Sequence, residues 1–258
     1  MDVLDPTTQA GEDALLAIVR EPRQTLVALD FDGTLAPIVA VPADARALPA
    51  ALEAIQGLAA LPGTTVVLVS GRALDDLAAV SGFGPPVRLV GSHGLEPDDG
   101  PVPLDDGQRD RLDRLNAEVD ALVDGAAGVR TERKPAGVAV HVRGAAPEVG
   151  TRVLDALRDG PAAAPGILST PGKAVLDLAV TDVNKGLALD RMRGDAAVFF
   201  AGDDVTDETA FARLRPGDVG VKVGEGDTAA THRVTDPAEL ADLLGELLTS
   251  RRARLTNR

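Results

Sequence analysis

The sequence contains no cysteine, no tryptophan and no tyrosine, and five phenylalanines are its entire aromatic content. Without cysteine the chain has no disulfide, no thiol nucleophile and no cysteine-ligated zinc. Without tryptophan or tyrosine, a sugar ligand cannot stack on an indole or phenol ring. No apolar run is long enough to span a membrane, and residues 1–21 have an acidic start instead of the basic region of a signal peptide. We therefore expect a cytoplasmic protein without a membrane partner.

The charge balance is strongly acidic, with a formal net charge of −14 over 258 residues. A nucleic-acid binder needs a basic surface, so we expect no nucleic-acid partner. An acidic protein that binds a small anion must gather cations locally or hold a metal ion. The hydrophobic content of 45% is enough for a packed core, and the length allows one large domain or two small ones. We expect a monomer that binds a small molecule.

The spacing of apolar residues predicts an α/β fold with a doubly wound, Rossmann-like parallel sheet. The predicted strands are residues 26–29, 65–69, 87–90, 197–201 and 219–223. The predicted helices are residues 9–19, 48–58, 73–80 and 238–248, with another beginning at residue 184. The arginine-rich end, residues 251–258, is predicted to be a solvated tail.

A different pattern occupies the middle of the chain. Residues 106–123 and 147–158 have helical spacing, whereas residues 129–134, 137–143, 167–170 and 174–180 alternate with period two, which is typical of an antiparallel sheet. We therefore expect an inserted α+β cap domain at residues 105–185. The catalytic core would comprise residues 1–104 and 186–258, because an exposed loop tolerates such an insertion.

Polar residues stand where several of these elements begin or end. Asp30 and Asp32 follow the first buried strand, Ser70 follows the second, Asp203 follows a later one, and Lys185 opens a helix. In open α/β sheets, ligands bind at the carboxyl ends of the strands. Carboxylate oxygens suit Mg²⁺, and a lysine and a hydroxyl can bind phosphate oxygens. The pattern indicates a site for a phosphorylated ligand.

Each of these residues also has an ordinary structural explanation. Ser70 could cap a helix, and Lys185 could be solvated behind an Asn184 cap. Asp204 and Asp207 could be first-turn acids that interact well with a helix dipole. A structural role can explain one polar residue at a strand end more easily than it can explain several together. We therefore favour a binding site.

The motifs Asp-Phe-Asp-Gly-Thr-Leu and Gly-Asp-Asp-x-x-Asp, with Ser70 and Lys185, resemble the four motifs of the haloacid-dehalogenase-like phosphohydrolases. The resemblance implies that Asp30 is the nucleophile and Asp32 the general acid/base, with Ser70 and Lys185 completing the catalytic set. It also implies that Asp30, the Asp32 carbonyl and Asp203 bind Mg²⁺. The residues implied to support the ion from behind its ligands are Asp204 and Asp207.

Further motifs are similar to those of the trehalose-6-phosphate phosphatases. They are Ser70-Gly71-Arg72, Gly91-Ser92-His93-Gly94-Leu95-Glu96, Glu132-Arg133-Lys134, His141-Val142-Arg143, Gly172-Lys173 and Asn184-Lys185-Gly186. This resemblance implies hydrolysis of trehalose 6-phosphate through an aspartyl-phosphate intermediate. The implied substrate-binding residues are Gly71, Arg72, His93, Glu132, Lys134, His141, Arg143 and Lys173. Alternatives are a phosphatase for sucrose 6-phosphate or mannosyl-3-phosphoglycerate, or a catalytically silent regulator that binds a sugar phosphate.

Alternation in residues 137–143 places Val138, Val140 and Val142 on one face of the cap sheet and His141 with Arg143 on the other. If the valines pack under the cap helices, the opposite face presents polar groups that suit sugar hydroxyls. An ordinary solvated sheet face would show the same pattern. The chain departs from the family at Val142, where tyrosine is frequent, and at residues 177–180, where Glu-Ile/Leu-Arg-Pro is frequent.

Overall fold

The computed structural model describes residues 24–100 and 102–256, which form two compact units. The first unit contains residues 24–100 and 183–256, and the second contains residues 102–182. The second unit thus ends three residues before Lys185, which belongs to the first. The helix predicted at residues 9–19 lies outside the described residues.

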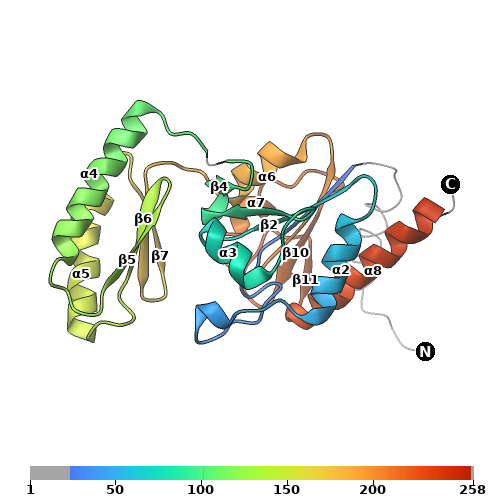
Figure 1. The fold of residues 1–258 in the computed structure, drawn as a ribbon, viewed down its shortest axis with the longest axis horizontal. Helices are drawn as coiled ribbons and strands as arrows, with labels where there is room; N and C mark the ends of the chain where they lie inside the picture. The colour runs from blue at the N-terminus through green and yellow to red at the C-terminus, as the bar shows by residue number, and fades with distance from the viewer. Residues whose placement is uncertain (1–23, 101, 257–258) are drawn as a thin grey trace. The chain divides into compact units, whose positions relative to one another are not determined.

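The first unit is built on a seven-stranded sheet of order β11-β10-β9-β1-β2-β3-β4 (Figure 1). Every neighbouring pair is parallel except β3 and β4. The strands are β1 (Thr25–Leu29), β2 (Thr64–Val69), β3 (Arg88–Gly91), β4 (Glu96–Pro97), β9 (Ala197–Gly202), β10 (Val219–Val223) and β11 (His232–Val234). The predicted parallel core is confirmed, although the short β4 and β11 were not predicted.

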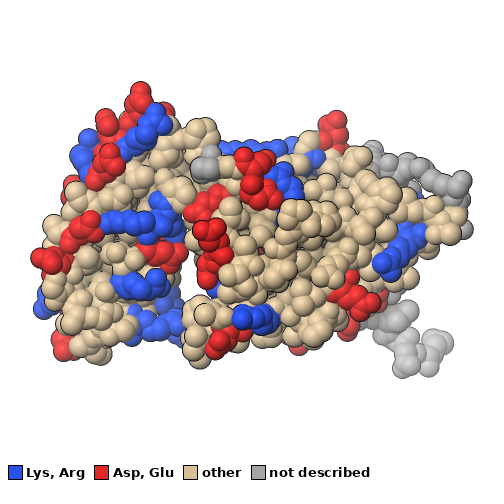
Figure 2. All heavy atoms as spheres, in the orientation of Figure 1, with Lys and Arg blue, Asp and Glu red and all other residues tan. Residues whose placement is uncertain are grey.

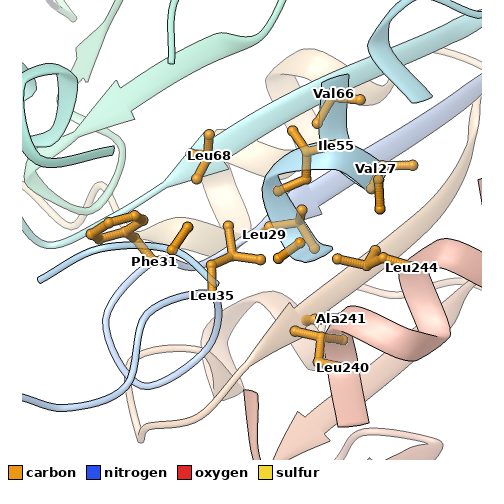
Figure 3. Close-up of a cluster of buried hydrophobic side chains, with 14 of the residues drawn as sticks. Val27, Leu29, Phe31, Leu35, Ile55, Val66, Leu68, Leu240, Ala241 and Leu244 are labelled. Atoms are coloured by element: carbon orange, nitrogen blue, oxygen red, sulfur yellow. The ribbon is translucent and has the colours of Figure 1, made fainter. Parts of the chain in front are cut away.

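Helices cover both faces of this sheet, which explains the unbroken apolar run of β1. Val27 and Leu29 pack on one face with Ile55 and Leu244 (Figure 3). Leu26 and Ala28 pack on the other face, in a second buried cluster. The helices are α2 (Pro49–Ala59), α3 (Leu74–Ser81), α6 (Lys185–Arg193), α7 (Glu208–Phe211) and α8 (Pro237–Thr256). Both faces of β1 are therefore buried, and β1 is held in the middle of the layer.

The second unit is a four-stranded antiparallel sheet of order β5-β6-β8-β7 with two helices (Figure 1). Its elements are α4 (Asp106–Val123), β5 (Arg130–Lys134), β6 (Gly137–His141), α5 (Pro147–Asp159), β7 (Leu168–Gly172) and β8 (Val175–Ala179). Val138 and Val140 are fully buried, and Val142 packs against Gly150 of α5. The predicted valine face is confirmed as the core of an α+β cap.

The end of the chain differs from the prediction in its secondary structure and in the burial of Arg251. The predicted tail is instead helical, because α8 continues to Thr256, and Arg251 is buried, whereas residues 252–256 are exposed as predicted. Arg251 donates hydrogen bonds to the hydroxyls of Thr25, at 2.7 Å, and Thr64, at 3.1 Å. Arginine spacing could not reveal these partners, because both lie near the other end of the sequence.

Among the helices that the structure describes, none has the length and hydropathy needed to cross a membrane.

Arg251→Ala should destabilise the first unit, because it removes the partner of two threonine hydroxyls at the start of β1 and β2. We expect the free energy of unfolding to fall by about 1–3 kcal/mol, the range for leaving buried polar groups unsatisfied. Urea denaturation measures this change, with the exposed Arg254→Ala as the matched control. Equal midpoints for the two variants would show that the tail contributes nothing.

Candidate active site

Two carboxylates meet where the central strands of the first unit end. Asp30 directly follows β1 and Asp203 directly follows β9, and the two strands pair with Leu29 opposite Ala201. The Asp30 N–H continues this ladder by donating to the Ala201 carbonyl at 2.9 Å. The Thr34 hydroxyl lies 3.2 Å from Asp203 Oδ1 and 3.4 Å from Asp30 Oδ2. Strand pairing alone therefore brings together two acids that are distant in sequence.

Lys185 is buried between two carboxylates. Its Nζ lies 2.8 Å from Asp30 Oδ1 and 2.8 Å from Asp207 Oδ1, and its side chain is 2% exposed. Asn184 places it there by capping α6, since the Asn184 side chain accepts the Leu187 N–H at 3.0 Å. The alternative of a solvated lysine is therefore wrong. A buried ammonium in direct contact with carboxylates is an element of a functional site or a structural ion pair.

Asp207 holds the loop that carries Asp203. Its Oδ2 accepts the backbone N–H groups of Asp203 and Asp204, each at 3.1 Å, while its Oδ1 contacts Lys185. Glycine is required where the backbone passes these acids. Gly33 has φ +80°, and a Cβ there would lie 2.1 Å from Asp203 Oδ2. The Gly-Thr of the first motif thus leaves room for the acid of the last.

Burial raises the pKa of Asp30 well above its usual range, although Lys185 opposes the shift. Burial and then the charge of Asp207 raise the pKa of Asp203. Burial alone would lower the pKa of Lys185, but Asp30 and Asp207 outweigh it and raise that pKa, so Lys185 is charged. Acids with raised pKa values favour their protonated forms. Without a further cation, the stability that they contribute is lost as pH rises through those values.

The acid cluster fits a hard divalent cation. Oxygens of Asp30, Asp203 and Asp207 all lie within 4.8 Å of one another. Lys185 contacts Asp30 and Asp207, so full ionisation of the three carboxylates leaves two negative charges beyond the one that Lys185 balances. Oxygen donors of this kind are the preferred ligands of Mg²⁺ and Ca²⁺. Because both oxygens of Asp207 already accept hydrogen bonds, Asp30 and Asp203 are the better ligands, and Asp207 positions them.

The side chain of Asp32 points elsewhere. Arg72 Nε lies 2.6 Å from Asp32 Oδ2, and Arg72 Nη2 lies 2.6 Å from Asp32 Oδ1. Arg72 also donates to Asp76 at 2.7 Å and to the Pro42 carbonyl at 2.8 Å. Each nitrogen of the guanidinium therefore has a protein partner, and substrate binding by Arg72 stays a prediction.

Ser70 follows β2 and is buried, and its hydroxyl accepts the Arg72 N–H at 3.2 Å. It does not cap α3, whose N-cap residue is Ala73, so that alternative is wrong. Glu96 supplies the cap instead, because its carboxylate accepts the Leu74 N–H at 2.6 Å. This role of Glu96 was not predicted, since the helix start and the acid lie on different segments.

His93 lies against Gly71. A Cβ at Gly71 would be 2.5 Å from His93 Cε1, so a larger residue there would require the His93 ring to move. His93 and Ser92 both have positive φ values, +56° and +48°, which non-glycine residues seldom adopt. The backbone N–H of His93 donates to the Ser70 carbonyl at 2.8 Å and stabilises this conformation. The structure thus groups three predicted site residues, Ser70, Gly71 and His93, around the end of β2.

Two further residues complete the edge of the site. Lys222 is buried in β10 and donates to the backbone carbonyl of Asp203, a contact that was not predicted. A lysine within the apolar run of Val219–Val223 was the available signal. Asp204 is exposed, and its Oδ1 accepts both the N–H and the hydroxyl of Thr206 at 2.7 Å. Its predicted support of a metal stays a prediction.

The second unit carries its own polar cluster on the sheet face opposite the valines. Glu132 lies 3.0 Å from His141 Nε2, and this hydrogen bond lowers the pKa of Glu132 despite partial burial. Lys134 Nζ lies 2.6 Å from Asp177 Oδ1. Strand register places these residues on one face, because Ala139 pairs with both Glu132 and Asp177. The face is thus an ion-paired, partly exposed surface.

Arg143 and Lys173 lie outside this network. Both are exposed, and within the described part of the chain neither has a hydrogen-bond or ion-pair partner. Lys173 occupies the two-residue turn between β7 and β8, beside Ala174 with φ +62°. In the view of Figure 2, acidic and basic side chains are interspersed over the second unit. The substrate contacts of Arg143 and Lys173 stay predictions.

Comparison with known proteins gives a family match. A family model described as trehalose-phosphatase matches residues 28–242. The trehalose-phosphate phosphatase of Mycobacterium tuberculosis is 34% identical over 249 residues, with 87% of this chain and 61% of that protein covered. This chain thus spans about three fifths of the length of that relative.

Two solved structures share the fold. The C-terminal domain of Candida albicans trehalose-6-phosphate phosphatase has a TM-score of 0.74 at 24% identity, covering 93% of this chain and 96% of that one. The C-terminal domain of a Candida albicans trehalose synthase regulatory protein has a TM-score of 0.68 at 16% identity, covering 92% and 97%. At these identities the likeness establishes the fold alone, including its core and cap.

Divalent cation binding should stabilise the protein, because it relieves the excess charge of the acid cluster. MgCl₂ at 100 times its Kd should add about 2.7 kcal/mol and raise Tm. Asp203→Asn should lose most of this shift. Affinity should rise with pH, since the cation competes with protons on acids whose pKa values are raised.

The matched control is Asp32→Asn, which removes the same charge from a carboxylate that faces Arg72 instead of the cluster. It should keep most of the thermal shift. If Asp32→Asn and Asp203→Asn lost the shift equally, the cluster as defined here would not be the cation site.

Proposed function

This chain belongs to the trehalose-phosphatase family, and we propose that it hydrolyses trehalose 6-phosphate to trehalose and phosphate. The observation that carries the proposal is the placement of Asp30. It follows the central strand, one of its oxygens is bound by the buried Lys185, and Asp203 lies beside it. A carboxylate held in this way can form a covalent phosphoryl intermediate.

The two oxygens of Asp30 have different partners, and this difference favours one of them as the attacking atom. Oδ1 contacts Lys185 at 2.8 Å, whereas Oδ2 lies 3.4 Å from the Thr34 hydroxyl, a longer contact. Oδ2 therefore forms the bond to phosphorus as the bond from phosphorus to the sugar oxygen breaks. Asp32 supplies the proton that the leaving oxygen takes.

The second step regenerates the carboxylate. Asp32 accepts a proton from water as the water oxygen attacks phosphorus, and the bond between phosphorus and Asp30 breaks to release phosphate. Lys185 has three N–H donors and uses two on Asp30 and Asp207, so the third is left for a phosphoryl oxygen. Ser70 lies at the neighbouring strand end, where its hydroxyl supports the same phosphoryl group.

The residues fit Mg²⁺ as the cation. Asp30 and Asp203 would hold it through carboxylate oxygens, with the Asp32 carbonyl as the ligand that the family resemblance implies. When bound, Mg²⁺ would neutralise charge on the phosphate and on the acid cluster. A protein with a net charge of −14 would in this way present a locally cationic site to an anionic substrate.

The polar face of the second unit suits the sugar. Glu132, His141, Lys134 and Asp177 offer acceptors and donors that are partly exposed and already held in place by one another. We propose that Glu132 and His141 bind sugar hydroxyls. Gly71, His93, Arg143 and Lys173 remain proposed substrate contacts on the family resemblance. Asp177 stands where the family frequently has glutamate, so the carboxylate at this position is shorter by one methylene.

The regulatory protein that shares the fold makes a silent regulator the second candidate. Such a protein has no need of a nucleophile held by a buried lysine, or of a general acid/base. Phosphate release from trehalose 6-phosphate distinguishes the two candidates, and a panel with sucrose 6-phosphate and mannosyl-3-phosphoglycerate tests the choice of sugar.

Asp30→Asn should fold normally and release no phosphate above background, because an amide cannot serve as the nucleophile. Rapid-quench labelling with ³²P-labelled substrate should detect acid-stable phosphoenzyme in the wild type and none in the variant. The thermal midpoint of both proteins controls for folding. Substantial turnover by Asp30→Asn would remove the covalent mechanism.

Glu132→Ala should reduce kcat/KM for trehalose 6-phosphate far more than for p-nitrophenyl phosphate, which has no sugar to bind. A lost hydrogen bond to a substrate hydroxyl leaves the partner unpaired and costs about 1–3 kcal/mol, roughly 5- to 150-fold. Arg133→Ala is the matched control, because Arg133 is the next residue of β5 and bonds to Asn116 and Asp120 of α4 instead. Equal losses for both substrates in Glu132→Ala would show that this face does not bind the sugar.

A further inference from the structure

Arg72 and Asp32 form a paired fork that none of the motif assignments explains. Both oxygens of Asp32 accept from Arg72, each at 2.6 Å, through Nη2 and Nε. Such a bidentate pair fixes the plane of a carboxylate as well as its position. The Asp32 side chain is 34% exposed, so the carboxylate still reaches solvent at the site, whereas Arg72 is only 10% exposed.

Arg72 is itself held from three other sides. Its Nη1 donates to Asp76 of α3 at 2.7 Å, and its Nη2 donates to the Pro42 carbonyl at 2.8 Å. Its Cζ lies 5.8 Å from the centroid of the Phe31 ring, within the range of a cation–π contact. These partners come from three different segments of the first unit. The guanidinium is therefore a fixed platform, because moving it would break contacts on every side.

A general acid/base needs a fixed direction. Each carboxylate oxygen has two lone pairs, and the fork of Arg72 uses one on each oxygen. The remaining lone pair of each oxygen then lies in a plane that Arg72 sets. Without the fork, Asp32 would rotate freely on the turn after β1, and small errors in placement reduce proton transfer strongly.

We propose that Arg72 is a positioning residue that holds the carboxylate of Asp32 in the orientation for proton transfer. The proposal rests on the role of Asp32 in the proposed function. Arg72 would thus act on Asp32 and would not bind the phosphate or the sugar. Asp76 and the Pro42 carbonyl would hold Arg72 in place.

Aryl phosphates test this role without involving the sugar. p-Nitrophenyl phosphate has a weakly basic leaving group that departs without a proton. The leaving group of phenyl phosphate is about as basic as a tyrosine phenolate, pKa about 10, and needs one. Arg72→Gln should reduce kcat/KM for phenyl phosphate by about 10²-fold, the low end for lost acid/base catalysis, and leave p-nitrophenyl phosphate within about threefold.

A double-mutant cycle ties the effect to Asp32. Asp32→Asn alone should show the same dependence on the leaving group. Adding Arg72→Gln to it should cause little further loss, because the residue that Arg72 positions is already disabled. Arg72→Lys keeps the charge but not the fork, and it should recover only part of the activity. Millimolar methylguanidinium should restore phenyl phosphate turnover to Arg72→Ala.

Arg88→Gln is the matched control. Arg88 also forms an ion pair with an aspartate of the first unit, Asp98, but on the outer edge of the sheet. It should change neither substrate, and methylguanidinium should have no effect on it. Asp76→Asn, which removes one outer support, should shift phenyl phosphate turnover less than Arg72→Gln does.

Three outcomes would overturn the inference. Additive losses in the double mutant would mean that Arg72 acts independently of Asp32. Equal losses for both aryl phosphates would indicate phosphate binding. An increase in turnover would indicate that the fork restrains Asp32 instead of aiming it. Failure of the proposed function is distinguishable, since the wild type would then release no phosphate from any substrate, or Asp32→Asn would remain fully active.

Discussion

The contact between Lys185 and the carboxylates of Asp30 and Asp207 is the constraint on which the rest of the site depends. A buried ammonium needs paired charges, and two acids this close need a cation between them. Asp30 can supply one only because β1 lies in the middle of the sheet. Asp207 can supply the other only because the Gly202 backbone leaves room, since a Cβ there would lie 2.2 Å from Asp207 Cγ. The fold and the site are thus stabilised by the same contact.

The arrangement separates two kinds of carboxylate. Asp30 and Asp203 share a crowded cluster in which burial raises their pKa values and favours a bound cation. Asp32, two residues from Asp30, belongs to a different set of contacts built on Arg72. Residues two apart on an extended strand share a face, so the separation of these acids arises from the turn that follows β1, where the Leu35 N–H donates to the Phe31 carbonyl. The Asp-x-Asp spacing of the first motif gains its meaning from this separation.

Much of this could be predicted from the sequence. Buried runs that end in Asp30, Ser70 and Asp203 indicated neighbouring parallel strands, whose carboxyl ends must meet. Alternation also predicted the valine face of β6. What could not be predicted were pairings without a local pattern, such as Asp32 with Arg72, forty residues apart, and Arg251 with Thr25. Local spacing fixes the elements, but a long side chain selects its partner only after the elements have packed.

The two faces of the sheet in the second unit differ in composition and in burial. The valine face and its two helices hold the unit together, whereas Glu132 and His141 on the opposite face remain partly exposed and contribute little apolar burial. In the proposed function, a substitution on the polar face would therefore change which hydroxyl pattern is accepted, with little effect on folding. With this division, mutations at alternate positions of one strand could change substrate preference and the free energy of unfolding independently of each other.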